Sequence, residues 1–194
     1  MRSHASLPSM EQDSGQNQDE QRRETTGVSG RGHPFHQRFD EGSLFRSEVC
    51  ARQEIEAPIT DVWLALIDFP SYPVWNPFTP RVSTDLEIGS PVQLHVVMPG
   101  RSASDRTEWL NLVEPEKTIC WGMHMGAPWL LTANRWQCLT PLSDTRTEYV
   151  TTDKFSGLLA PLVMALYAKP IETGFQQVAD GLKAYVENRK ENNT

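Results

Sequence analysis

Three polar side chains lie in otherwise apolar segments and are the residues best suited to acid–base chemistry: Asp153, Asn134 and Tyr167. A carboxyl group buried among aromatic side chains loses hydration, which raises its pKa and suits it to proton transfer. Asp153 is therefore the candidate acid or base. Asn134 and Tyr167 are the candidate hydrogen-bonding groups that would orient a ligand beside it.

Other kinds of catalytic site lack support in the sequence. Cys120 and His124 share strand parity, but no third residue follows at a spacing typical of a metal site. The chain has no Gly-x-Ser-x-Gly motif and no glycine-rich phosphate loop or dinucleotide fingerprint. We therefore expect no metal and no cofactor.

Hydrophobic periodicity predicts the elements that must position these residues. Residues 48–57 alternate as a half-buried strand does, and from Pro58 the apolar residues recur at helical spacing until Pro70 and Pro73 end the pattern. Further strands are predicted at 81–85, 91–98, 106–113, 118–125, 129–139 and 145–155. Because turn residues separate them by short connections, we expect antiparallel neighbours.

A long amphipathic helix is predicted at the C-terminal end. Its apolar residues recur every three or four positions from Met164 to Tyr185, and Pro170 should kink this helix or divide it in two. Its apolar stripe needs a partner, and the concave face of the sheet is the only large apolar surface left.

Two groups of motifs resemble the START-like, or SRPBCC, superfamily, and within it the polyketide cyclase/dehydrase and lipid-transport group. The first runs from Ile55-x-Ala57-Pro58 to Trp75-Asn76-Pro77-Phe78, and the second includes Asp153-x-Phe155-x-Gly157 and Gly174-Phe175. The resemblance covers about residues 45–188 and implies an α+β helix-grip fold. In that fold a curved antiparallel sheet of about 6–7 strands surrounds a long C-terminal helix, with two short helices after the first strand. Relatives often carry His at the position of Asn134 and Glu at that of Asp153.

Strand alternation then predicts which side chains line a cavity under the helix. In 118–125 we favour the apolar face with Trp121 and Met123, and in 129–139 the face with Asn134 and Trp136, since that choice leaves Arg135 and Gln137 in solvent. The predicted ligand-binding residues are Trp75, Trp121, Met123, Trp136, Thr151, Met164 and Ile171. An apolar lining with a few polar groups is typical of a small-molecule site.

Composition limits the partners. The chain has 194 residues with a formal net charge of −7, which argues against nucleic acid, and it has no apolar run long enough for stable membrane insertion. Residues 1–43 are polar and are predicted to be a disordered tail, followed by one domain over 44–190. Three cysteines without motif spacing favour a reducing, cytoplasmic location, and the chain is expected to be a monomer or homodimer.

The sequence thus predicts a protein that encloses a polyketide- or lipid-like molecule. As an enzyme it would cyclise, dehydrate or isomerise this molecule in secondary metabolism. Two alternatives remain: a non-catalytic carrier or sensor, and a co-chaperone-like interaction module. The residues alone do not choose among these, because one scaffold supports all three.

Overall fold

The computed structural model describes residues 45–191, all within one of the two units into which the chain divides, residues 33–194. The predicted tail at 1–43 lies outside the described residues. Among the described residues, no helix combines the length and the apolar character needed to cross a membrane.

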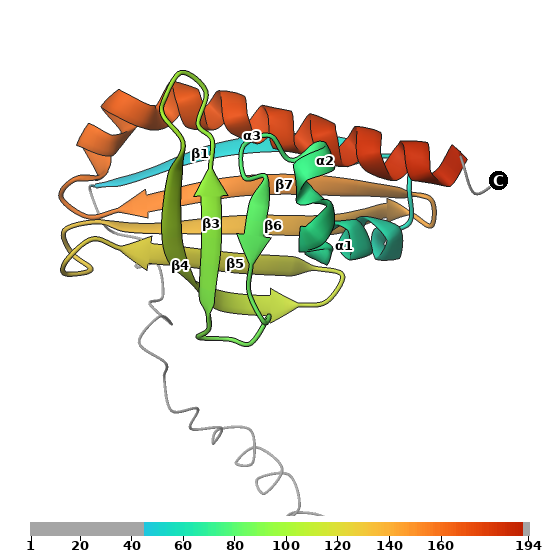
Figure 1. Cartoon of the computed structure of the whole chain (residues 1–194), viewed down its shortest axis with the longest axis horizontal. Helices are drawn as coiled ribbons and strands as arrows, with labels where there is room; N and C mark the ends of the chain where they lie inside the picture. The colour runs from blue at the N-terminus through green and yellow to red at the C-terminus, as the bar shows by residue number, and fades with distance from the viewer. Residues whose placement is uncertain (1–44, 192–194) are drawn as a thin grey trace, which may run out of the picture. The chain divides into compact units, whose positions relative to one another are not determined.

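A single antiparallel sheet of seven strands forms the framework, in the order β1-β7-β6-β5-β4-β3-β2 (Figure 1). The strands are β1 (Arg46–Ile55), β2 (Arg81–Ser83), β3 (Pro91–Val96), β4 (Ser104–Glu114), β5 (Thr118–His124), β6 (Thr132–Ser143) and β7 (Arg146–Ser156). The predicted antiparallel sheet is confirmed. Its first strand pairs with its last, so β1 and β7 lie side by side although they are far apart in sequence.

The helices follow the predicted order too. They are α1 (Ile59–Ile67), the 3-10 turn η1 (Phe69–Ser71), α2 (Tyr72–Trp75) and α3 (Ala160–Glu191). Pro58 precedes the first helical residue, where its missing N–H leaves no bond unmade. The hydroxyl of Tyr72 donates to the carbonyl of Leu66 at 2.6 Å, which holds α2 against the end of α1.

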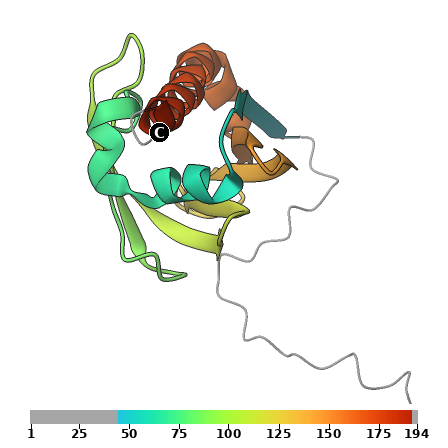
Figure 2. The same cartoon turned by 90° about the vertical axis from the view of Figure 1, so that its right-hand side faces the viewer.

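The sheet curls around α3, and the short helices lie at the end where α3 finishes (Figures 1 and 2). The helix packs mainly against β1. From Ile171 onward its inward side chains are almost fully buried: Phe175, Val178, Ala179 and Leu182 have no exposed surface. This half of the helix fills the concave face of the sheet.

Two glycines allow that close approach. A Cβ on Gly174 would overlap the ring of Phe78, and a Cβ on Gly181 would overlap the carbonyl oxygen of Trp75. The two positions are seven residues apart, about two helical turns, so they lie on the same side of α3. The segment after α2 can therefore press directly against the helix backbone.

Pro170 does not divide the helix, because α3 is continuous from Ala160 to Glu191. Proline has no N–H, so the carbonyl of Leu166, four residues earlier, loses its helical donor. The guanidinium of Arg101 donates to this carbonyl at 2.8 Å and lies over the ring of Tyr167, 4.7 Å from its centroid. The connection between β3 and β4 is thereby attached to the N-terminal half of α3.

Gly181→Ala tests the close approach. Alanine is the better helix former by about 1 kcal/mol, so a purely local effect would stabilise the protein. Because the overlapping atom belongs to the backbone of Trp75, we expect instead that the free energy of unfolding falls by about 1–3 kcal/mol in urea denaturation. Ala184→Ser, at an exposed position on the same helix, should change it by less than about 0.5 kcal/mol. A more stable Gly181→Ala protein would contradict the contact.

Candidate functional site

A cavity of about 390 Å³ lies between the sheet and the N-terminal half of α3. It is lined by Phe78, Thr79, Leu94, Val96, Met98, Arg106, Glu108, Trp121, Met123, Met125, Leu131, Ala133, Arg135, Asp153, Phe155, Val163, Tyr167 and Ile171. Most of these side chains are apolar, and four are charged. This composition and size match those of small-molecule sites.

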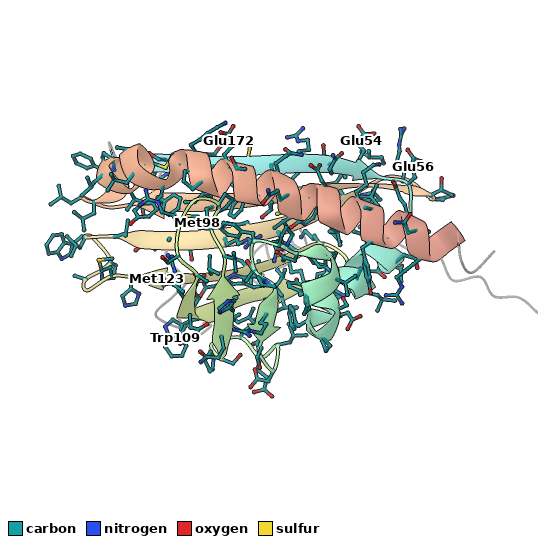
Figure 3. All side chains as sticks on the ribbon, turned by 45° about the horizontal axis from the view of Figure 1, so that its top comes forward. Glu54, Glu56, Met98, Trp109, Met123 and Glu172 are labelled. Atoms are coloured by element: carbon teal, nitrogen blue, oxygen red, sulfur yellow. The ribbon has the colours of Figure 1, made fainter. Side chains whose placement is uncertain are left out.

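The cavity exists because α3 covers this part of the sheet without filling it. Val163, Tyr167 and Ile171 are the only helix residues that line it, and the first two are half-buried. Figure 3 shows Met98 beneath α3 and Glu172 on the outward side of the same helix. Met125 is 50% exposed and Arg106 is also exposed, so the cavity meets solvent near these two residues.

Sheet register places three of the lining residues in one row. Trp121 on β5 pairs with Arg135 on β6, and Arg135 pairs with Asp153 on β7. Directly opposed residues of antiparallel strands have Cβ atoms about 5 Å apart and point to the same face. An indole, a guanidinium and a carboxyl group therefore lie side by side on the cavity floor.

Arg135 is a buried cation with only 6% of its surface exposed. Its Nε donates to the hydroxyl of Thr151 at 3.4 Å and its Nη1 to that of Thr79 at 3.1 Å. The guanidinium also lies over the rings of Phe175 and Phe78, 4.5 and 5.6 Å from their centroids. Its Nη2 has no hydrogen-bond partner among the described residues.

Two carboxyl groups share the cavity with this cation. Desolvation raises the pKa of Glu108 to about 7, with a further increase from the nearby charge of Asp153 and a partial offset by Arg135 and Arg106. Desolvation likewise raises the pKa of Asp153 to about 6, again offset in part by the two arginines. Both side chains are half-buried, because the cavity that surrounds them reaches solvent.

Neither carboxyl group is neutralised by direct pairing. In residues 45–191 the ion pairs within 4.0 Å involve other residues, and no hydrogen bond ties either carboxyl group to a neighbour. Near neutral pH Asp153 is mainly ionised and Glu108 is divided between its two forms. The pair can therefore accept and donate a proton in the same cavity.

The structure brings half of the predicted site residues to the cavity. Five of them line the cavity: Asp153, Tyr167, Trp121, Met123 and Ile171. Thr151 is fully buried beside them and supports Arg135, as described above. Their roles in binding or catalysis stay predictions.

The predicted face of β6 is wrong. Asn134 accepts a hydrogen bond from Asn111 at 2.8 Å on the opposite face of the sheet, and the ring of Trp136 lies 5.9 Å from the ammonium of Lys154. The prediction assumed that Arg135 would stay in solvent. Two threonine hydroxyls and two aromatic rings instead make its burial tolerable, and the whole strand turns its other face inward.

Two further predicted residues lie elsewhere. Trp75 is buried beside Tyr185, with ring centroids 6.3 Å apart, and borders a separate surface groove between α2 and the C-terminal half of α3. Met164 is half-buried against the core and does not line the cavity. α3 presents Val163 and Tyr167 there instead.

Sequence analysis missed three charged lining residues, Arg135, Glu108 and Arg106. One signal for Arg135 was present: Leu131, Ala133 and Leu139 share its parity and mark that face as the apolar one. For Glu108 the parity shared with Leu110 was a weaker indication. Among residues 45–191 the structure has no group of three or more His, Cys, Asp or Glu side chains placed to hold a metal ion.

Comparison with solved structures gives the same fold at low sequence identity. The Zhui aromatase/cyclase from Streptomyces sp. R1128 has a TM-score of 0.61 and 21% identity, covering 74% of this chain and 95% of that one. Norcoclaurine synthase from Thalictrum flavum, in complex with a transition-state analogue, has a TM-score of 0.57 and 16% identity, covering 75% and 96%. A START superfamily protein from Mycobacterium smegmatis has a TM-score of 0.57 and 18% identity, covering 73% and 97%.

A search of curated protein sequences found no match. A family model described as polyketide cyclase/dehydrase and lipid transport matches residues 46–187, which is nearly the whole described region. The chain therefore belongs to the polyketide cyclase/dehydrase and lipid transport family.

Proposed function

We propose that the cavity binds a largely apolar, polyketide-like molecule and that Asp153 and Glu108 catalyse its ring closure with loss of water. The observation that carries this proposal is the pair of unneutralised carboxyl groups in an apolar cavity, with pKa values of about 6 and 7. A general acid–base pair works best when its pKa values lie near the operating pH. The family description and the likeness to an aromatase/cyclase support this reaction class.

The chemistry divides between the two groups. A methylene between two carbonyls is acidic, and ionised Asp153 takes its proton to give an enolate. The enolate carbon attacks a carbonyl further along the same chain, and protonated Glu108 gives its proton to the new alkoxide. Glu108, now ionised, then removes a second proton from carbon, and Asp153, now protonated, gives its proton to the departing hydroxyl. Water leaves, the ring becomes unsaturated, and both carboxyl groups return to their starting forms. The cavity walls contribute by holding the chain folded with its reacting carbons close together.

Asp153→Asn tests the catalytic role. With a linear poly-β-ketone of four carbonyls as substrate, we expect the enzyme-directed ring-closed product to form at least about tenfold more slowly, because the base is lost. The product is followed by liquid chromatography and mass spectrometry, and binding by calorimetry should persist. Asp144→Asn, in the exposed β6–β7 turn, is the matched control. Equal product formation by Asp153→Asn and wild type would remove Asp153 from the mechanism.

Filling the cavity tests ligand binding separately from catalysis. Ala133 lines the cavity, and Ala133→Phe adds a ring to its wall. Native mass spectrometry of freshly purified protein should detect a bound small molecule in the wild type and none in this variant. A ligand retained by both proteins would place binding elsewhere. Binding of the linear poly-β-ketone without formation of any ring-closed product would indicate a carrier and contradict the proposed enzyme.

The raised pKa of Glu108 also predicts how stability depends on pH. Its pKa in the folded protein exceeds the ordinary value of 4.5, so the folded state binds more protons than the unfolded state up to about pH 7. Stability should therefore fall as pH rises through this window. The free energy of unfolding, measured in urea, should therefore fall between pH 5 and pH 8 in the wild type. Since the group is half-buried, we expect this fall to be smaller by about 1–2 kcal/mol in Glu108→Gln. Glu87→Gln, at an exposed position, should follow the wild type.

A further inference from the structure

Two hydrogen-bond donors on the cavity floor have no acceptor in the protein. They are Nη2 of Arg135 and Nε1 of Trp121, and both atoms are buried without a partner among the described residues. Trp121 is 1% exposed and Arg135 is 6% exposed, so both side chains are more than nine-tenths buried. Leaving a buried donor unpaired destabilises the folded protein, and more so for a charged group.

Strand register places the two side chains that carry these donors next to each other. Trp121 and Arg135 are direct cross-strand partners on β5 and β6, and both line the cavity. Gln137, further along β6, also has an unpaired amide nitrogen, but it does not line the cavity. The two unpaired donors on side chains that line the cavity therefore belong to neighbouring residues, and one of them carries a permanent positive charge.

The surroundings of Arg135 favour an anionic acceptor. The carboxyl group of Asp153 lies in the next row position, yet it forms no ion pair within 4.0 Å of the guanidinium. The two hydrogen bonds that Arg135 does make go to neutral threonine hydroxyls. A carboxylate or enolate oxygen at Nη2 would gain a charge-assisted hydrogen bond, which is roughly twice as strong as a neutral one.

We infer that the molecule bound in this cavity carries an anionic oxygen, of a carboxylate or an enolate, which the paired donors of Arg135 and Trp121 hold against the sheet. This inference rests on the proposed function and narrows its substrate class to acidic, ring-forming ketones and aromatic acids. The apolar walls then hold the carbon skeleton. The charged end faces β5 and β6, beside Asp153.

Calorimetry with two matched probes tests the inference without any catalytic turnover. Naphthalene-2-carboxylate and naphthalene-2-carboxamide have nearly the same shape, and only the first is charged. We expect the wild-type protein to bind the carboxylate at least about tenfold more tightly, the lower end of the worth of a hydrogen bond between charged groups. Arg135→Gln should reduce this preference to less than about threefold.

Two further variants keep the result interpretable. Trp121→Phe keeps an aromatic ring but removes the N–H together with part of the indole ring. The smaller ring should affect both probes alike, whereas the lost N–H should reduce the preference for the carboxylate over the carboxamide several-fold. This variant decides the question should Arg135→Gln fail to fold. Arg52→Gln removes the same positive charge at an exposed position on β1 and should retain the wild-type preference.

Protonation provides a second readout. The charged and titratable groups that face Arg135 across the cavity are Glu108 and Arg106 on β4, Asp153 on β7 and Tyr167 on α3. Because Glu108 has a pKa of about 7, lowering the pH from 8 to 6 removes a negative charge near the proposed anion. Carboxylate affinity should rise over this range in the wild type. The rise should be smaller in Glu108→Gln, and carboxamide affinity should stay flat.

The outcomes separate this inference from the proposed function. Equal affinity for both probes, unchanged in Arg135→Gln and Trp121→Phe, would overturn the anion site and leave the cavity as a binding site for neutral molecules. Failure of the wild-type protein to bind either probe would overturn both. A carboxylate preference that persists in both variants would place the anion at another residue and contradict the assignment to this pair.

Discussion

The close contact between the C-terminal half of α3 and the concave sheet determines where this protein can hold a ligand. Gly174 and Gly181 let the segment around Phe78 and Trp75 press against the helix, and the inward side chains between the two glycines, Phe175, Val178 and Ala179, are completely buried. The helix is thus fixed at one end. Toward its N-terminus the helix covers the cavity, and Val163, Tyr167 and Ile171 are the residues of α3 that line it. The packed core under the C-terminal half of α3 and the cavity under its N-terminal half therefore both follow from the position of this one helix.

Pro170 lies where these two halves of the helix meet. Its missing N–H frees the carbonyl of Leu166, and Arg101 satisfies that carbonyl from the β3–β4 connection. The same connection contains Met98, which lines the cavity. A break in the helical hydrogen-bond pattern is therefore used to attach a neighbouring loop beside the cavity. The carbonyl oxygen of Leu166 thus links Pro170 in the helix to the β3–β4 connection and its cavity-lining residue Met98.

Sequence periodicity predicted the order of strands and helices because these patterns are local. The change from alternation to helical spacing at Pro58, and the long apolar stripe around Phe175, need no knowledge of tertiary contacts. The inward face of β6 could not be derived in this way. Its choice depends on whether Arg135 can be buried, and that depends on Thr79, Thr151 and the rings of Phe78 and Phe175. Those four residues come from three distant parts of the chain.

The same error explains why the polar part of the candidate site was only half predicted. Asp153 was found because its strand reads clearly as alternating, with Tyr149, Thr151 and Phe155 on one face. Glu108 and Arg106 lie on a strand that is rich in charged residues, as an exposed strand is. Its sequence pattern therefore does not distinguish charged side chains that line the cavity from those that face solvent. Preference for apolar faces works for core strands and fails where a protein buries charge for function.

Strand register gives the polar groups a fixed geometry that loops would not. Trp121, Arg135 and Asp153 occupy successive strands in one row, so their spacing is set by backbone hydrogen bonds of the sheet. Arg135 is further held by two hydroxyls and two rings, which leaves it little freedom to turn toward Asp153. Because Arg135 and Asp153 form no ion pair with each other, both groups stay available to a bound molecule. The apolar walls lower the polarity around these groups and so strengthen each of these interactions, which suits the proposed ligand with both an anionic oxygen and an acidic C–H.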